Sequence, residues 1–513
     1  MSAANGTDKP TLVAVIGTTG VGKSQLGVEI AHSLASRTGS PPRTGEVINH
    51  DSMQCYRGLD VITNKATAEE RQGVRHHLMD FLEPGREWRV TDFQRDALEK
   101  IRELESRGAL PICVGGTSYY LQNLIFPNQL ASEMSQPSSP ATGPRTMNDI
   151  ATFPDLLRQA IEDLPDELRE LFLALPALPA TSTPDDFPVP FPLYLLPPRL
   201  RSPDTLTPAL YRLLQLVDPA SAERWHWRDV RKVRRALDIV WEGRTWNDVV
   251  AEQQEKVHEG PRFRTLIFWL YSETEQLNPR LDGRVDKMIQ RGLLNELDEL
   301  WQIAETNTTT GSVDYSKGIY QAIGYKEFEP YLAARHRDPS RTLENDAELK
   351  ELFERGVESM KTATRQYAKR QVKWIKSKLL PAVHQLGDAA PEVTVALLDA
   401  SDLSQWHDRV QQPAIHMLNA FLDRTPLPDP CSLSAAAAMH LAPTRSDDAQ
   451  AKSKRACDTC TRDPLKPFMV EERQWNAHVK TKAHRIQAQN ASGTARRSGK
   501  APPEGQGHEG AAV

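Results

Sequence analysis

Cysteine is scarce in this sequence of 513 residues, and long apolar segments are missing. The five cysteines, Cys55, Cys113, Cys431, Cys457 and Cys460, are too few and too scattered for a disulfide framework, which indicates a reducing compartment. No apolar run approaches the roughly 20 residues of a membrane span. Residues 1–10 have neither the apolar core of a signal peptide nor an Arg-rich amphipathic pattern. We therefore expect an intracellular protein with no membrane partner.

A strong excess of charge is also missing, because the formal net charge is only −5. A markedly basic composition would indicate nucleic-acid binding by the chain as a whole, so any such contact must come from local patches. The length is sufficient for about two to four domains with a sizeable core.

The most specific motif lies near the start of the chain. An apolar, β-branched run over 11–16 is followed by G-x-x-x-x-G-K-S, and the pattern over 25–36 predicts a helix. Glycines let backbone N–H groups close around phosphate oxygens, and a helix N-terminus adds positive partial charge. The stretch therefore predicts a di- or triphosphate site rather than a chance glycine turn. The expected phosphate-binding residues are Gly17, Thr18, Thr19, Gly20, Val21, Gly22, Lys23 and Ser24. Lys23 would reach the phosphate furthest from the organic end of the ligand, and Ser24 would ligate Mg²⁺.

Strands and helices alternate after this P-loop. A short strand over 46–52 delivers Asp51 at its end, and the strand over 110–114 ends in Gly115-Gly116-Thr117. This alternation predicts a parallel α/β sheet with the P-loop, Asp51 and Thr117 at the carboxyl ends of its strands. An ATPase would carry an acidic Walker-B residue where the strand over 110–114 ends in glycine. We therefore expect the loop to hold a leaving diphosphate rather than to hydrolyse ATP.

Composition divides the rest of the chain. The region over 128–208 is rich in proline and has a helical pattern over 154–175 that is interrupted at Pro165. A second helical pattern follows over 209–241, with a break at Pro219. The expected organisation is a disordered N-terminus (1–10), a P-loop core (11–127), a Pro-rich and helical insertion (128–260), a completion of the core (261–423), a linker (424–455), a small finger (456–490) and a disordered tail (491–513).

Near the C-terminus, two cysteines and two histidines have the residue types and the spacing of a zinc finger. Cys457, Cys460, His478 and His484 form C-x-x-C and H-x5-H pairs that suit tetrahedral Zn²⁺. Residues 451–500 hold twelve Lys or Arg against four Asp or Glu, which favours a nucleic-acid-binding module stabilised by structural zinc. A zinc-stapled protein-interaction module is the alternative.

Two helices are expected to carry basic faces. The first includes Arg231, Lys232, Val233, Arg234 and Arg235, and the second places Arg365, Lys369 and Lys373 four residues apart. Each face alone could be solvated surface. Together, and with Tyr367 and Trp374 among the cations of the second, they favour a track for a nucleic-acid backbone with stacking positions.

The chain resembles the tRNA dimethylallyltransferase (tRNA isopentenyltransferase) family over about residues 11–380, and its zinc-binding tail resembles that of eukaryotic members. The matching segments occur in family order and are Gly17–Ser24, Asp51–Tyr56, Ile62–Lys65, His76–Asp80, Val114–Tyr120, Arg231–Leu237, Arg284–Met288, Gln321–Tyr325 and Thr364–Gln371. The resemblance implies a P-loop core with a helical insertion, acting as a monomer. The implied reaction transfers a dimethylallyl group from dimethylallyl diphosphate to the exocyclic amine of the adenosine 3′ of the anticodon, giving N6-isopentenyladenosine. It also implies a cytoplasmic enzyme, with mitochondrial or nuclear pools possible for members of this kind.

The resemblance assigns roles to individual residues. Asp51 would accept the amine proton, while Lys23, Arg284 and Mg²⁺ on Ser24 would neutralise the departing diphosphate. Thr117 would line the channel where a flipped adenine meets the donor. The anticodon stem-loop would contact Asp51, Ser52, Met53 and Gln54, the run Arg231–Arg235, and Arg365, Lys369 and Lys373. Two features depart from the family pattern: His50, where Ala or Ser is expected, and the long, proline-rich connection over 128–208.

Two other functions remain open at this point. A P-loop small-molecule or nucleoside kinase would use Asp51 as a base for a hydroxyl group, but it has no use for basic helices or a finger. A non-catalytic RNA-binding protein would not need the intact Lys23, Ser24 and Asp51.

Overall fold

The computed structural model of the chain describes residues 9–37, 42, 44–127, 147–175, 196–256, 260–307, 313, 315, 317–386, 392–442, 454–463 and 466–488. Its contacts divide the chain into a core unit, Met1–Glu133 with Lys256–Thr444, and a helical unit, Met134–Glu255 with Arg445–Val513. The disordered ends expected over 1–10 and 491–513 lie outside the described residues, apart from residues 9 and 10. Residues 128–146 and 176–195 of the expected insertion also lie outside them.

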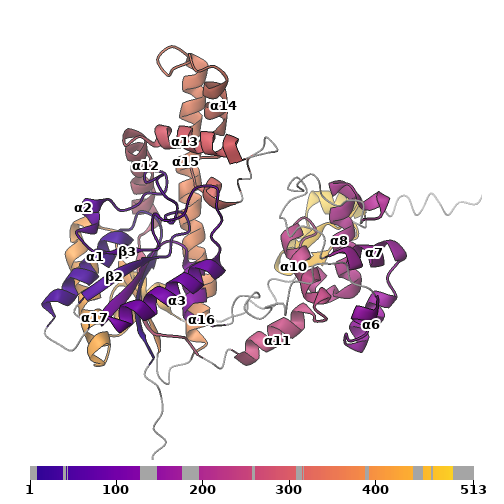
Figure 1. The fold of residues 1–513 in the computed structure, drawn as a ribbon, viewed down its shortest axis with the longest axis horizontal. Helices are drawn as coiled ribbons and strands as arrows, with labels where there is room; N and C mark the ends of the chain where they lie inside the picture. The colour runs from indigo at the N-terminus through magenta and orange to yellow at the C-terminus, as the bar shows by residue number, and fades with distance from the viewer. Residues whose placement is uncertain are drawn as a thin grey trace, which may run out of the picture. The chain divides into compact units, whose positions relative to one another are not determined.

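The core unit is built on a parallel sheet of six strands in the order β3-β2-β4-β1-β5-β6 (Figure 1). The strands are β1 Thr11–Gly17, β2 Thr44–Asn49, β3 His76–His77, β4 Ala109–Val114, β5 Arg264–Tyr271 and β6 Val393–Asp399. Val13 of β1 lies opposite Ile112 of β4 on one side and Leu266 of β5 on the other. The strands all run the same way, so the loops after β1, β2 and β4 meet at one edge, as the sequence predicts.

Helices cover both faces of this sheet, which confirms the predicted fold class. Leu12, Ala14 and Ile16 of β1 join one core, and the alternate residues Val13 and Val15 join the other. The first core includes helices α3 (Val90–Ser106) and α4 (Ser118–Ile125), and the second includes α1 (Lys23–Ser33) and α17 (Gln412–Asp423). Burial on both faces explains why the strands read as continuous apolar runs.

Further helices extend the core unit beyond the sheet (Figure 1). They are α2 Ala68–Arg71, α12 Thr274–Gln290, α13 Leu293–Asn307, α14 Glu329–Arg337 and α15 Ala347–Trp374, and α15 continues through a π-helical turn, Ile375–Leu379, into α16, Leu380–His384. A β-carbon at Gly356 of α15 would lie 2.7 Å from the Phe328 ring, so glycine there lets the N-terminus of α14 approach the long helix. Helix α15 carries Arg365, Lys369 and Lys373, which the sequence predicts on one helix.

Part of the expected linker over 424–455 is packed chain. Helix α18, Ala435–Leu441, follows a short 3₁₀ turn, and Ala437 and Leu441 are buried in the core that also contains α3. Its N-terminus is capped by Ser434, whose hydroxyl accepts from the Ala437 N–H at 3.0 Å. Small residues hide this helix in sequence, because alanine supplies no apolar contrast to mark its buried face.

The helical unit contains the described part of the insertion and the C-terminal finger. Its elements are α6 Asp155–Glu162, α7 Asp166–Ala174, α8 Pro203–Val217, α9 Pro219–Arg224, α10 Val230–Trp241, α11 Trp246–Lys256, β7 Lys454–Ala456, β8 Met469–Glu471 and α19 Trp475–His478. Pro165 and Pro219 each stand at the start of a helix, as predicted. Among the described helices of both units, none is long and apolar enough to cross a lipid bilayer.

Candidate active site

The P-loop connects β1 to α1 and depends on glycine at three positions. Gly17, Gly20 and Gly22 have φ angles of +142°, +80° and +88°, a region that residues with a side chain rarely adopt. Space is limiting as well, since a β-carbon on Gly22 would lie 2.6 Å from the ring of Trp406. The loop therefore takes a backbone conformation that only glycine permits, with Lys23 and Ser24 in the first turn of α1.

Lys23 lies at the positive end of α1 and turns back over the loop. Its ammonium donates to the Thr18 carbonyl oxygen at 2.7 Å. Burial lowers the pKa of Lys23 to about 8; the carboxylate of Asp51 opposes this shift, and the charge of Arg284 adds to it. If a phosphate binds in the loop, the Lys23 ammonium can donate to a phosphate oxygen in place of the Thr18 carbonyl oxygen.

Asp51 follows β2, and a buried asparagine fixes its backbone. The Asn49 side chain accepts from the Asp51 N–H at 3.0 Å and donates to the Asp51 carbonyl oxygen at 3.1 Å and to the Leu78 carbonyl oxygen at 2.9 Å. One oxygen of the Asp51 carboxylate accepts from the Met53 N–H at 3.0 Å. The sequence analysis did not assign Asn49, although a polar residue that closes an apolar strand is the signal that could have found it.

A cavity of about 780 Å³ brings ten of the predicted site residues together, but Thr117 is not among those that line it. Those that line it are Thr19, Gly20, Gly22, Lys23, Ser24, Asp51, Ser52, Met53, Gln54 and Arg284, and Tyr367, Arg370 and Gln371 of α15 line it too. Desolvation lowers the pKa of Arg284 to about 10, and the charge of Asp51 opposes this shift. Burial and the charge of Asp51 also raise the pKa of Tyr367, so its phenol stays neutral. The carboxylate of Asp51 thus faces two cations across the cavity.

Thr117 forms hydrogen bonds with Ser52 in the loop that follows Asp51. Its hydroxyl accepts from the Ser52 N–H at 3.1 Å and lies 3.3 Å from the Ser52 hydroxyl. Gln54, expected at the RNA, donates instead to the carbonyl oxygens of Thr63 at 3.2 Å and Asn64 at 3.0 Å. These contacts hold the turn after β2 in one shape.

No carboxylate from the strands beside β1 lines the cavity among the described residues. β4 is followed by Gly115 and Gly116, and Glu273 after β5 accepts from the Tyr271 hydroxyl at 3.1 Å. Glu29 of α1 and Glu70 of α2 also line the cavity, but neither stands at the end of a strand beside β1.

His50, the departure noted in the sequence, is fully buried beneath this site. Burial and the charge of Lys23 lower its pKa to about 4, so the imidazole is neutral. A β-carbon on Gly115 would lie 2.6 Å from the carbonyl carbon of His50 and 2.8 Å from its Nδ1, so glycine there permits the close approach of the His50 backbone and leaves space for its ring.

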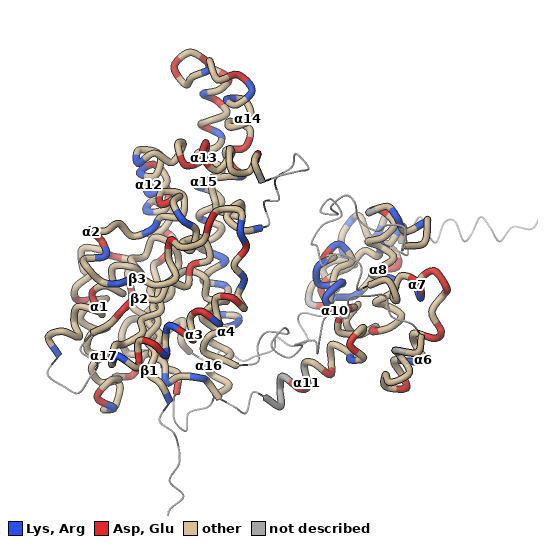
Figure 2. The backbone as a smooth tube through the Cα atoms, viewed as in Figure 1, with Lys and Arg blue, Asp and Glu red and all other residues tan. Residues whose placement is uncertain are grey.

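The basic run of α10 is only partly available to a ligand. Val233 is buried in the core of the helical unit, and Arg234 is 7% exposed, with its guanidinium bonded to Asp238 and to the Leu175 carbonyl oxygen. Arg231 and Lys232 are exposed, and Figure 2 shows Lys and Arg gathered along α10. Val233 and Arg234, which are expected to contact RNA, are therefore buried in this structure, and their contact with RNA stays a prediction. Val233 belongs to the apolar stripe through Val230 and Leu237, and Arg234 lies at the edge of that stripe.

The basic face of α15 is divided in the same way. Arg365 pairs with Asp282 of α12, and Lys361 pairs with Asp286 at 2.8 Å. Lys369, Arg370 and Lys373 are exposed. Only the second half of this face presents unscreened positive charge to solvent.

The four predicted zinc ligands converge in the helical unit. Their ligand atoms all lie within 4.8 Å of one another. Sγ of Cys457 and of Cys460 lie 3.4 and 3.5 Å from Nδ1 of His484, and Nε2 of His478 lies 3.2 Å from the same atom. Tetrahedral Zn²⁺ with ordinary bond lengths requires S···N edges of ~3.5 Å and N···N edges of ~3.3 Å. The four residues therefore fit a structural zinc ion.

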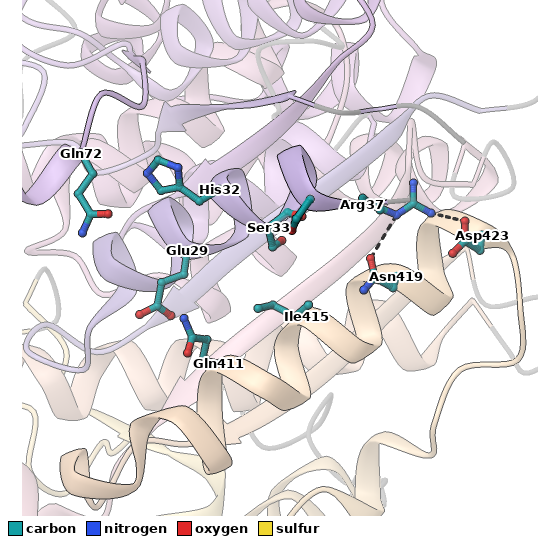
Figure 3. Close-up of a pocket in the computed structure, with 10 residues that line it drawn as sticks. Glu29, His32, Ser33, Arg37, Gln72, Gln411, Ile415, Asn419 and Asp423 are labelled. Carbon is teal, nitrogen blue, oxygen red and sulfur yellow. Dashed lines mark hydrogen bonds and ion pairs between the residues drawn. The ribbon is translucent and has the colours of Figure 1, made fainter. Parts of the chain in front are cut away.

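A second cavity, of about 680 Å³, lies between α1 and α17 (Figure 3). Its polar lining includes Arg37, which bonds Asn419 at 3.1 Å and pairs with Asp423. None of the residues predicted for catalysis lines this cavity. Its charges join the two helices to each other.

Comparisons with known proteins identify relatives of this chain. A family model described as IPP transferase matches residues 54–171 and 199–378. The tRNA dimethylallyltransferase of Schizosaccharomyces pombe is 35% identical over 485 residues, covering 92% of this chain and 94% of that relative. The tRNA dimethylallyltransferase of Saccharomyces cerevisiae is 32% identical over 480 residues, covering 92% and 91%.

A solved structure supports the same assignment. It is described as a eukaryotic dimethylallyltransferase acting on tRNA, and it aligns with a TM-score of 0.66 at 29% identity, covering 95% of this chain and 99% of that one. The chain belongs to the IPP transferase family.

Proposed function

We propose that this chain transfers a dimethylallyl group from dimethylallyl diphosphate to the exocyclic amine of the adenosine 3′ of the anticodon in tRNA. One observation carries the chemistry: the P-loop cations and the Asp51 carboxylate line one cavity, and the strands beside β1 bring no second carboxylate to it. The site can therefore bind a diphosphate and accept a proton, and among the described residues that line it no acid follows β4 or β5, where a Walker-B residue would activate water against a γ-phosphate.

The donor's diphosphate lies in the P-loop in this proposal. The N-terminus of α1, Lys23 and Arg284 surround that position with positive charge. As the allylic C–O bond breaks, both bonding electrons move to the diphosphate, and these groups stabilise the growing negative charge. Ser24 lines the cavity with the oxygen ligand that Mg²⁺ prefers, and a bound Mg²⁺ would add further positive charge at the leaving group.

The acceptor approaches from the Asp51 side. The lone pair of the adenine amine forms the new N–C bond, and the amine then loses one proton to the Asp51 carboxylate. The adenine must leave the anticodon stack to reach this buried position.

RNA contacts outside the cavity come from the exposed cations. We assign the exposed Lys369 and Lys373 of α15 and the exposed Arg231 and Lys232 of α10, together with the half-buried Arg235, to the phosphate backbone of the anticodon stem-loop. Cys457, Cys460, His478 and His484 would hold a structural Zn²⁺ that orders the basic finger.

Label transfer tests the proposal. Purified protein is incubated with radiolabelled dimethylallyl diphosphate or γ-labelled ATP, with and without an anticodon stem-loop RNA. Prenyl label must enter the RNA, and the rate must fall by at least about 10³-fold in Asp51→Asn, because the amide cannot accept the proton.

Asp408→Asn is the matched control, since Asp408 is an exposed carboxylate on the π-helical turn His407–Gln411 of the same unit. It must transfer label at the wild-type rate. Transfer of phosphate from ATP to a small molecule would establish the kinase alternative instead, and RNA binding without any transfer would establish a non-catalytic role.

A further inference from the structure

Gln371 is a buried polar side chain for which the sequence analysis gives no role. It lies in the last turn of α15 and is 5% exposed. A buried carboxamide is stable only when its oxygen and its nitrogen both find partners. The identity of those partners indicates what this glutamine does.

Both partners belong to the loops of the cavity. Oε1 accepts from the Thr19 N–H in the P-loop at 2.9 Å, and Nε2 donates to the Gly116 carbonyl oxygen after β4 at 2.9 Å. β1 and β4 are neighbouring strands, so one amide bridges the loops that leave their carboxyl ends. It thereby connects α15 to both.

The bridge also sets the place of the proton acceptor. A β-carbon on Gly116 would lie 2.6 Å from Nε2 of Gln371 and 3.2 Å from Oδ2 of Asp51. The Gly116 backbone is thus packed between the amide and the carboxylate. Through these two contacts, the spacing between the P-loop and Asp51 depends on Gln371.

We propose that Gln371 is a positioning residue that holds the P-loop and the Gly116 loop at the spacing required between the departing diphosphate and Asp51. This inference rests on the proposed function. A misplacement of about 1 Å between reacting groups can lower a rate by about 10²-fold, so the expected effect is on the chemical step. The exposed cations of α15 are unaffected, so RNA affinity should not change.

Gln371→Met tests this role, because methionine keeps the length of the side chain and removes both hydrogen bonds. We expect kcat to fall 10- to 100-fold at saturating RNA and donor, with the Kd for the stem-loop within twofold of wild type. Gln302→Met, at an exposed glutamine of α13, is the matched control and must keep wild-type kcat. If Gln371→Met lowers the melting temperature but keeps kcat within twofold, the inference is wrong and the amide is merely structural.

Two further variants keep the test decisive. Gln371→Glu retains an acceptor for the Thr19 N–H but loses the donor to Gly116, so its kcat must also fall, and wild-type activity would overturn the inference. Gly116→Ala displaces the same amide, so the two substitutions act on one contact. The fall in kcat of the double variant must therefore be smaller than the product of the falls in the two single variants. A wild-type protein that transfers no label would instead refute the proposed function itself.

Discussion

Lys23 combines a functional position with a charge that depends on pH. Burial and the nearby Arg284 lower its pKa to about 8 in the protein without ligand, although Asp51 opposes the shift. A bound diphosphate would raise that pKa again, because it adds negative charge beside the ammonium. Donor affinity is therefore linked to the protonation of this one side chain.

The sign of the pH effect follows directly. Below about pH 8 Lys23 is already charged, so the Kd for dimethylallyl diphosphate should be nearly constant. Above that pH the neutral lysine must take up a proton on binding, so Kd should rise by up to about tenfold per pH unit. Lys23→Arg should abolish this rise in Kd above pH 8, since arginine stays charged. Calorimetry of donor binding from pH 7 to 9.5 checks this prediction. If Kd still rises above pH 8 in the arginine variant, the pH dependence comes from another group.

Gly22 tests how much the P-loop depends on a close approach. Gly22→Ala forces a left-handed alanine, at an expected strain of about 1–3 kcal/mol, and also places a β-carbon 2.6 Å from the Trp406 ring. Gly73→Ala provides the matched control, because Gly73 has a φ of +80° with no atom within 4 Å of its β-carbon. Thermal unfolding should show a larger loss of stability for Gly22→Ala than for Gly73→Ala. Adding Trp406→Phe to the Gly22→Ala protein should recover only the part of that loss by which it exceeds the loss at Gly73. Equal losses at both glycines would mean that the ring moves aside freely.

At the scale of elements, the strands were readable because parallel strands buried on both faces are continuous apolar runs. β3 could not be predicted, because its two residues, His76 and His77, are too few to show an alternation of apolar and polar side chains. The P-loop, Asp51 and the zinc ligands follow from local spacing. The roles of Gln371 and Trp406 cannot be predicted from local spacing, because each side chain bonds a residue more than 350 positions away in the sequence. The burial of Arg234 depends on a partner carbonyl in another helix, at Leu175.

The two halves of the α15 basic face should respond differently to substitution. Lys369→Ala and Lys373→Ala remove exposed cations, so each should weaken RNA binding and reduce the slope of log K against log salt by about 0.7–0.9. Arg365→Ala removes a cation already paired with Asp282 and should change that slope much less. RNA binding measured by filter retention between 50 and 300 mM salt separates these outcomes. A full slope change in Arg365→Ala would mean that RNA breaks the ion pair.

At the scale of the whole molecule, the finger is not a separate appendage. Its β7 packs against α9 of the insertion, and the hydroxyl of Tyr211 in α8 lies 3.9 Å from the Met469 sulfur. The ammonium of Lys466 lies 5.9 Å from the ring centre of Trp227, in the loop between α9 and α10. Segments 134–255 and 445–513 thus form one unit across a large gap in sequence.

Zinc removal should therefore loosen more than the finger. In Cys457→Ser, or after chelation, loss of the metal should unfold residues 454–488, because small zinc modules owe their stability to the ion. Amide hydrogen exchange should then also rise in α9 and over 225–229, which lose their contacts with β7 and Lys466. Helix α3 of the core unit supplies the internal control and should keep its protection, and prenyl transfer to saturating RNA should persist with a weaker salt dependence of binding. An increase in exchange confined to 454–488 would show instead that the finger folds independently of the insertion, and that its contacts with Tyr211 and Trp227 contribute no stability to the helices beneath it.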